Sequence, residues 1–162
     1  MSSSPRSQGI GARIPRKEDD RLMRGRGQFV ADIRLPHLHD VAFLRSPYAH
    51  ARIIHIEIPA ALRGQVFIAQ DLESIKPIRA VSGLAGFKVS DQPILAQDKV
   101  RYVGEPIAMC VAPTRAEAED IASQIHLHVE ELPPVVDMLF GRTPDAPLLH
   151  ESWSDNVFLE TN

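Results

Sequence analysis

Residues 43–52 read Phe-Leu-Arg-Ser-Pro-Tyr-Ala-His-Ala-Arg, and this stretch decides the fold. One apolar run ends at Pro47, and a second begins almost at once over residues 51–58. Proline fixes its own φ angle and lacks an N–H group, so it interrupts a sheet ladder and favours a corner. The pattern predicts two strands that meet at a rigid bend. The cationic residues of this bend, which we take as interface candidates, are Arg45, His50 and Arg52.

A second segment, residues 99–108, repeats this order of strand, bend and strand. A strand is predicted over 99–103, and residues 107–112 form a continuous apolar strand that we expect to be covered on both faces. A glutamate on the tight bend between them allows two interpretations. Its carboxylate accepts hydrogen bonds from backbone N–H groups of the turn, or it meets a neighbouring surface, and the residues alone do not separate these. The interface candidates of this bend are Gly104 and Glu105.

Short strands, one helix and loops account for the rest of the folded region. Residues 40–46 are predicted as a strand, and residues 51–58 alternate between a polar and an apolar face. The polar face would hold Ile53, His55 and Glu57, and the apolar face Ile54, Ile56 and Ile58. Residues 74–93 lack periodicity and are expected to form a long loop. Thirteen prolines spread along the chain suit many short elements better than a helix bundle.

The clearest helix signal covers residues 115–124. Thr114 precedes it and Glu117 follows three residues later, which is the pattern of a capping box. An alternating strand over residues 125–130 comes next. The order strand, helix, strand predicts a compact crossover, which is right-handed when its strands are parallel.

Composition excludes several classes of protein. The chain of 162 residues has a net charge of −3 and a pI near 6.1, which argues against a nucleic-acid partner. No apolar run is long enough to cross a bilayer, so we expect no membrane insertion, and no apolar stretch follows the N-terminus as in a secretory signal. The single cysteine allows no internal disulfide and is compatible with a reducing compartment. We therefore expect a cytoplasmic location.

No residue is assigned a catalytic, cofactor-binding or metal-binding role. Two histidine pairs, 37/39 and 126/128, have a spacing of two, but zinc usually needs three or four ligands and no further ligand stands at a familiar spacing. The second pair fits the solvent face of an amphipathic strand better. Cys110 lies inside an apolar run, where a thiol behaves as a small hydrophobic side chain.

The ends of the chain differ from its middle. Residues 1–8 are polar and rich in serine, and we expect a disordered tail. Residues 9–36 are dense in charge and read as an extended arm, whereas residues 37–137 form the folded domain and 138–162 an extended C-terminal tail. The backbone N–H groups of the arm could cradle a phosphate. The arm lacks the preceding strand and the Lys-Ser/Thr of a nucleotide-binding loop, however. We therefore prefer the interpretation that the arm docks against an acidic or polar surface of another domain or subunit. Its interface candidates are Arg24, Gly25, Arg26 and Gly27.

Several segments in this order resemble one family. They are residues 10–11, 15–19, 24–32, 35–36, 43–52, 99–108, 115–124, 132–137, 146–151 and 156–157. Together they are similar to the opening of the large subunits of molybdenum hydroxylases, a group that includes xanthine dehydrogenase, aldehyde oxidase and the carbon monoxide dehydrogenase large chain.

The resemblance implies an α+β fold. Residues 37–137 would be the N-terminal α/β hammerhead domain, a mixed sheet of short strands with one main crossover helix near residues 115–124 and an extended N-terminal arm. The tail, 138–162, would lead to molybdopterin domains that are absent from this sequence. The chain itself would bind no cofactor. Molybdopterin would belong to the complete large subunit, and iron–sulfur and FAD groups to partner subunits.

The function implied is structural. The chain would be the assembly domain of a molybdopterin-dependent oxidoreductase that hydroxylates aldehydes or N-heterocycles, and it would be inactive alone. Its partners would be the remaining molybdopterin domains, an iron–sulfur subunit and, in some enzymes, a FAD subunit. The alternative is an independent protein-binding module unrelated to redox catalysis. A prominent exposed apolar face would favour the assembly role.

Overall fold

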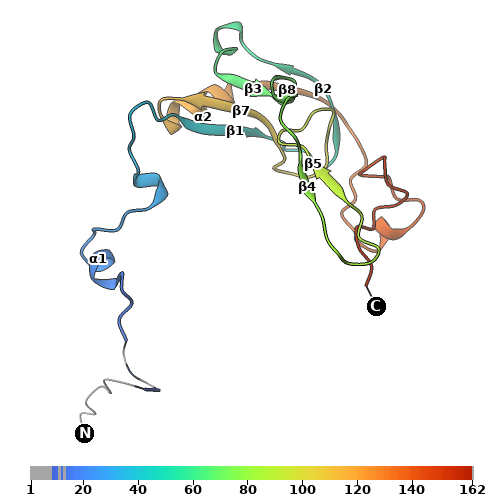
Figure 1. Ribbon diagram of the computed structural model, residues 1–162. Coiled ribbons are helices and arrows are strands. Elements are labelled where there is room, and N and C mark those ends of the chain that lie inside the picture. The colour runs from blue at the N-terminus through green and yellow to red at the C-terminus, as the bar shows by residue number, and fades with distance from the viewer. Residues whose placement is uncertain (1–8, 11, 13, 162) are drawn as a thin grey trace. The chain divides into compact units, whose positions relative to one another are not determined.

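The computed structural model describes residues 9, 10, 12 and 14–161, which divide into two compact units after Leu38. The first unit contains helix α1 (Asp19–Met23) and the 3-10 helix η1 (Val30–Asp32) (Figure 1). Helix η1 begins after Phe29, where the Asp32 carboxylate accepts a hydrogen bond from the Phe29 N–H at 3.0 Å. The tail expected at residues 1–8 lies outside the described residues.

The second unit holds three small sheets, and every strand pair in the described part of the chain is antiparallel. The first sheet has the order β1-β7-β3, with β1 Asp40–Arg45, β7 Pro106–Ala112 and β3 Val66–Ile68. The second has the order β6-β2-β8, with β6 Lys99–Val100, β2 Ala51–Glu57 and β8 His126–Glu131. The third is a hairpin of β4 Ile78–Ala80 and β5 Ser90–Gln92. Helical elements are α2 Arg115–Ser123, η2 Ala60–Leu62, η3 Ala69–Leu72 and η4 Phe140–Arg142.

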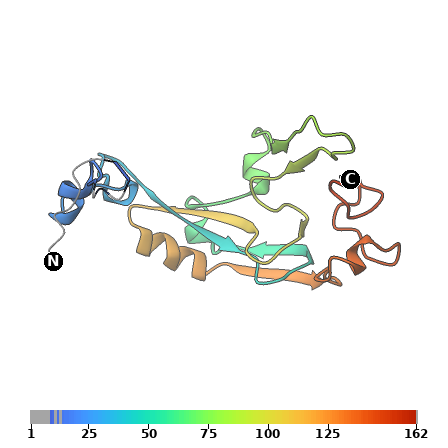
Figure 2. The same cartoon turned by 90° about the horizontal axis from the view of Figure 1, so that it is seen from below.

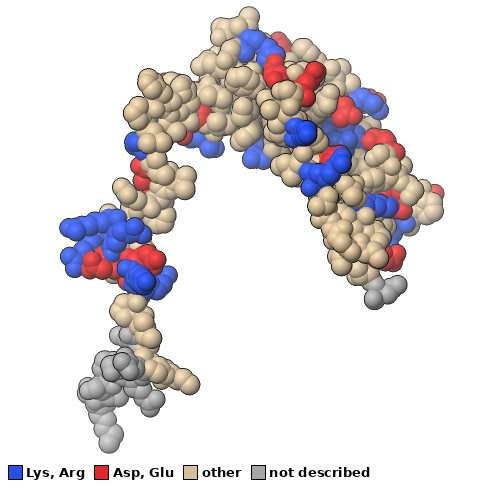
Figure 3. All heavy atoms as spheres, viewed as in Figure 1, with Lys and Arg blue, Asp and Glu red and all other residues tan. Residues whose placement is uncertain are grey.

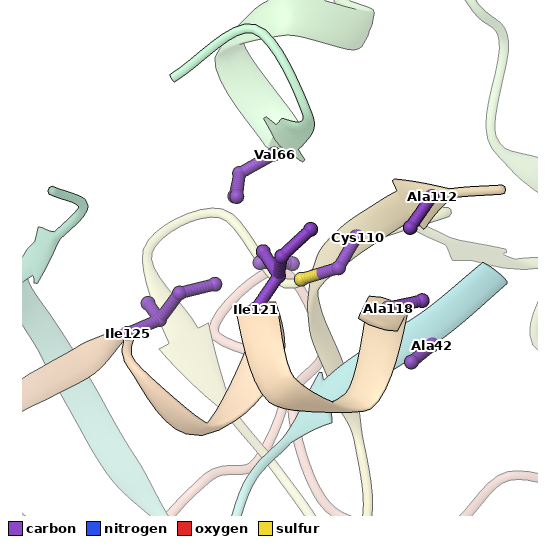
Figure 4. Packing of buried hydrophobic residues seen from close by; sticks show 8 residues of the cluster. Ala42, Val66, Cys110, Ala112, Ala118, Ile121 and Ile125 are labelled. Carbon is purple, nitrogen blue, oxygen red and sulfur yellow. The ribbon is translucent and has the colours of Figure 1, made fainter. Parts of the chain in front are cut away.

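Strand β7 lies at the centre of the core, as its apolar run predicts. It pairs with β1 on one side and β3 on the other, and helix α2 packs against β1 and β7 (Figure 2). In the main cluster, Ile121 of α2 meets Cys110 of β7 and Val66 of β3 (Figure 4). Burial of these apolar side chains supplies the main driving force for folding.

Helix α2 begins as predicted. The Thr114 hydroxyl accepts a hydrogen bond from the Glu117 N–H at 3.3 Å, and the Glu117 carboxylate accepts one from the Thr114 N–H at 3.2 Å. This capping box satisfies two backbone donors that the first turn would otherwise leave unpaired. The α+β architecture with one main helix is confirmed.

Two details of the predicted sheet are wrong. The sheets are not mixed, and the segment β7–α2–β8 is not a crossover between parallel strands, because β7 and β8 belong to different antiparallel sheets. The corner at Pro47 explains the difference. It directs β1 into the sheet of β7 and β2 into the sheet of β8, so α2 connects two sheets.

The predicted alternation of β2 is also wrong. Its register with β8 shifts between Ile53 and His55, which is the mark of a bulge. The extra residue changes which side chains face inward. Ile53 therefore packs against buried residues, whereas Ile54 is 61% exposed. Ile56 keeps its predicted inward position.

Three other segments differ from expectation. The long loop predicted over residues 74–93 contains the β4–β5 hairpin, which has little apolar alternation to reveal it. Strand β6 ends at Val100 rather than 103, because the chain turns before Gly104. Residues 138–161 are not extended throughout, since they begin with η4 and continue as successive turns.

A clasp between two bends and a clamp on the C-terminal segment

The two bends singled out by the sequence lie together and share backbone hydrogen bonds. The Ser46 N–H donates to the Glu105 carbonyl at 2.9 Å, and the Gly104 N–H donates to the Ser46 carbonyl at 2.8 Å. The guanidinium of Arg45 adds a third bond, to the Gly104 carbonyl at 2.8 Å. Gly104 has a φ angle of 90°, which glycine adopts without the penalty that a Cβ atom brings. Together these contacts form a clasp between residues 45–46 and 104–105.

Glu105 is buried inside its own bend. Its side chain is 5% exposed, and Oε2 accepts a hydrogen bond from the Arg101 N–H at 2.6 Å. Burial raises the pKa of this carboxyl group, and the hydrogen bond from the Arg101 backbone opposes the rise. The geometry is that of a carboxylate that satisfies its own turn, which is the first of the two interpretations that the sequence left open.

His50 ties the start of β2 to the segment after β8. Its ring Nδ1 lies 2.8 Å from the Pro133 carbonyl oxygen. Because a carbonyl only accepts, Nδ1 carries the hydrogen and donates it. Its backbone carbonyl accepts from the Leu132 N–H at 2.9 Å. The other ring nitrogen, Nε2, is buried and has no hydrogen-bond partner among the described residues. His50 therefore holds the second sheet together rather than facing outward.

Arg52 has a partner on the neighbouring strand. Its Nε lies 3.2 Å from a carboxylate oxygen of Glu130 across the β2–β8 pair, and both side chains are exposed. An exposed pair of this kind contributes about 0–1 kcal/mol. Thus the five interface candidates of the second unit make contacts within the chain, although Arg45 and Arg52 still reach the surface.

The four candidates of the arm belong to the first unit. Arg24 pairs with Asp20 at 2.7 Å, and the Arg26 N–H donates to the Arg21 carbonyl at 2.9 Å as α1 ends. Gly25 has a φ angle of 66°, which suits the end of a helix. Both signs of charge gather over α1, so this surface is not uniformly cationic (Figure 3).

A cluster that sequence reasoning missed holds the C-terminal segment. Lys99 is 5% exposed, and its ammonium group makes an ion pair with Glu151. The Arg101 Nε donates to the Leu149 carbonyl at 2.9 Å, and the Asn156 side chain accepts from the Leu149 N–H at 2.9 Å. We call this set, Lys99, Arg101, Glu151 and Asn156, the clamp. No local pattern signals this set, because the partner that a buried ammonium group needs lies about 50 residues further along the chain.

The clamp changes the titration of nearby groups. The ammonium of Lys99 lowers the pKa of the Glu151 carboxyl through their hydrogen bond. Burial lowers the pKa of His150, and the positive charges of Arg101 and Lys99 act in the same direction. A pocket of about 520 Å³ lies beside the clamp. Its lining includes Arg101, Glu105, His150, Trp153 and Phe158.

The other residues considered for chemistry are spread out. Burial raises the pKa of the Cys110 thiol, which suits a side chain packed in the core. His128 is exposed and lies 3.3 Å from Glu57. Within residues 14–161 and the few described before them, no three His, Cys, Asp or Glu side chains gather to hold a metal ion.

The fold and the clasp define an α/β hammerhead domain. Residues 24–133 match the family model described as the aldehyde oxidase and xanthine dehydrogenase a/b hammerhead domain. The chain belongs to this family, and its relatives are molybdenum hydroxylases.

Named relatives and solved structures give the same result. The chain is 41% identical over 133 residues to the nicotine 6-hydroxylase large subunit of Paenarthrobacter nicotinovorans, covering 79% of this chain and 16% of the relative. It is 36% identical over 154 residues to the carbon monoxide dehydrogenase large chain of Afipia carboxidovorans, covering 93% and 18%. The crystal structure of quinoline 2-oxidoreductase from Pseudomonas putida 86 matches with a TM-score of 0.83 and 36% identity, over 96% of this chain and 20% of that one.

The chain spans less than a fifth of the length of the two curated relatives. In the described part of this sequence, no helix combines the length and the apolar character needed to cross a membrane.

Proposed function

We propose that this chain is the structural and assembly domain of the large subunit of a molybdopterin-dependent oxidoreductase. The observation that carries the proposal is the way the domain uses its own polar groups. The five interface candidates of the second unit make their contacts within the chain, in the clasp, with Pro133 and with Glu130. A domain whose charged side chains stabilise its own fold is suited to a structural role.

The residues present do not fit a resident molybdenum cofactor. Among the described residues, the buried polar side chains are Ser46, His50, Lys99 and Glu105, and all their buried polar atoms except His50 Nε2 have partners there. One buried ring nitrogen is no donor set for a pterin or a metal. We therefore assign no step of the reaction to this chain, and propose that the cofactor and the substrate pocket lie in other domains of the large subunit.

Exposed apolar side chains support assembly over an independent binding module. Two large hydrophobic residues of the arm, Met23 and Val30, are each 85% exposed. Several on the β4–β5 hairpin are more than half exposed as well. Each of the two units thus exposes large apolar side chains, and large exposed apolar patches mark contact with other polypeptide.

A chimera tests the proposal. The fifth of the Pseudomonas putida 86 quinoline 2-oxidoreductase chain that this sequence matches would be replaced by residues 1–162, and the chimera produced with its partner subunits. We expect it to assemble and to contain molybdenum at more than half of the native level. The control replaces the same fifth with an unrelated soluble domain of equal length, which should abolish assembly. A chimera as empty and unassembled as this control would overturn the proposal.

A further inference from the structure

The β4–β5 hairpin carries an apolar surface that the rest of the described chain leaves uncovered. Five large hydrophobic side chains on it and its flanks are each more than half exposed. They are Ile75, Ile78, Val81, Leu84 and Val89. A lone two-stranded hairpin is marginally stable in water, and these two strands pair only with each other. Further packing against this surface would therefore stabilise the hairpin.

Open space flanks the base of this hairpin. One pocket, of about 390 Å³, is lined in part by Ile75, Pro77 and Ile94. The pocket of about 520 Å³ beside the clamp includes Ser90 in its lining. Asp91 and Pro93 line both pockets. The base of the hairpin thus has hollows against it rather than a packed core.

The charges of the hairpin are already neutralised. Arg79 on β4 pairs with Asp91 on β5 through two hydrogen bonds of 2.6 Å, and Lys88 makes an ion pair with Asp155. What the hairpin offers to a partner is therefore mainly apolar, which fits the packing of polypeptide better than an acidic or nucleic-acid surface.

The last described residues of the chain lie on this hairpin. The Lys88 N–H donates to the Phe158 carbonyl at 3.1 Å, and the rings of Phe87 and Phe158 meet edge to face with centroids 4.7 Å apart. Both ribbon views show the C-terminal end beside β4 and β5 (Figures 1 and 2). Polypeptide that follows Phe158 therefore starts beside the hairpin, at a high effective concentration relative to the exposed apolar side chains.

We propose that the β4–β5 hairpin is the docking surface for the polypeptide that follows the hammerhead domain in the large subunit. This inference rests on the proposed function and adds the location of the contact. The occupant is the polypeptide chain joined after residue 162, packed against Ile78, Val81 and Leu84.

Thiol labelling tests the contact. Leu84→Cys would be made in the 162-residue chain and in the chimera, treated with a maleimide, and followed by mass spectrometry of the peptide that contains the new cysteine. The native Cys110 is buried and serves as an unreactive internal reference. We expect the new thiol to react at least tenfold more slowly in the chimera than in the isolated chain. Labelling of both proteins in urea controls for intrinsic reactivity.

A triple variant provides a second measurement. Ile78→Ser, Val81→Ser and Leu84→Ser together should leave the unfolding of the isolated chain almost unchanged, because these side chains are exposed there. In the chimera they should reduce the yield of assembled enzyme at least threefold. A matched triple variant at exposed residues outside the hairpin should lower the yield by less than threefold. Its substitutions are Ile54→Ser, Val136→Ser and Met138→Ser.

Other outcomes overturn the inference. Equal labelling rates in the two proteins, with an assembled chimera, would reject the hairpin contact and leave the proposed function intact. Protection in the isolated chain that grows with protein concentration would identify a second copy as the occupant. Protection that is independent of concentration and lost when residues 1–38 are deleted would identify the arm. A chimera that fails to assemble rejects the proposed function instead.

Discussion

At Glu105, a carboxyl group that the turn needs as an acceptor sits where burial disfavours its charge. Oε2 receives the Arg101 N–H at 2.6 Å, yet the pKa of the group is raised because water is excluded around it. The two effects oppose each other, and burial is the larger. The same residue type on an exposed turn would carry no such conflict.

This conflict predicts a pH dependence. The folded-state pKa lies above the unfolded value of about 4.5, so the contribution of Glu105 to stability is fully present below pH 4.5 and declines as pH rises through the folded pKa. Glu105→Gln keeps an acceptor and removes the ionisation. We expect the stability of this variant, relative to wild type, to increase as pH rises from 4 to 7. Urea unfolding followed by the fluorescence of Trp153 measures this.

The control for that prediction is Glu105→Ala, which removes the acceptor as well. It should be less stable than Glu105→Gln at every pH, by about 1–3 kcal/mol, because a buried N–H is left unpaired. Parallel pH profiles for wild type and Glu105→Gln would contradict the account of the raised pKa.

At the scale of elements, the two bends decide which sheet each neighbouring strand joins. The corner at Pro47 separates β1 and β2 into different sheets, and the turn at Gly104 leads β6 into β7. The clasp then joins the two turns through backbone groups of Ser46, Gly104 and Glu105. Short strands are thereby held in place by fixed turns at their ends.

The turn at Gly104 provides the second prediction. Its positive φ angle disfavours any side chain, although nothing lies within 4 Å of the place that a Cβ atom would take. Gly104→Ala should therefore lower the free energy of unfolding by about 1–3 kcal/mol through backbone strain alone. Gly64→Ala is the matched control, because Gly64 also has open space but no positive φ angle. Its effect should stay below about 1 kcal/mol, and equal effects at the two sites in thermal or urea unfolding would refute the strain argument.

The elements also show how far sequence patterns reach. The cap at Thr114 and the apolar run of β7 were predictable because each depends on residues close in the chain. The exposure of Ile54 was not, because the bulge that shifts its register depends on β8, more than 70 residues away. The hairpin at 78–92 also escaped prediction, since its exposed strands show no apolar alternation.

At the scale of the whole molecule, the clamp joins the C-terminal segment to the sheet of β6. Lys99 brings a buried ammonium group, and Glu151 reaches it from a segment about 50 residues further along the chain. The Glu151 side chain is 68% exposed, so water screens its half of the pair. In the same C-terminal segment, the ring centroids of His150 and Trp153 lie 4.6 Å apart.

The third prediction concerns this pair. The pKa of Glu151 is depressed, so its contribution to stability is present above the unfolded value of about 4.5 and is lost as pH falls through the folded pKa. Glu151→Gln should destabilise the chain by about 1 kcal/mol at pH 7, and the difference from wild type should shrink at pH 3. Glu160→Gln is the control, because its pair with Arg142 is exposed on both sides. A difference for Glu151→Gln that stays the same at both pH values would contradict the assignment.

The amino-acid sequence determined the features that act over short distances or through ordered motifs. These are the two bends, the capped helix, the buried strand and membership of the hammerhead family. The tertiary structure decided which surfaces the polar residues face. It turned Glu105 and His50 inward, joined Lys99 to Glu151 and left the hairpin uncovered. The physical reason is that caps and turns need only neighbouring residues, whereas partners for buried charges and the register of strands come from distant parts of the chain.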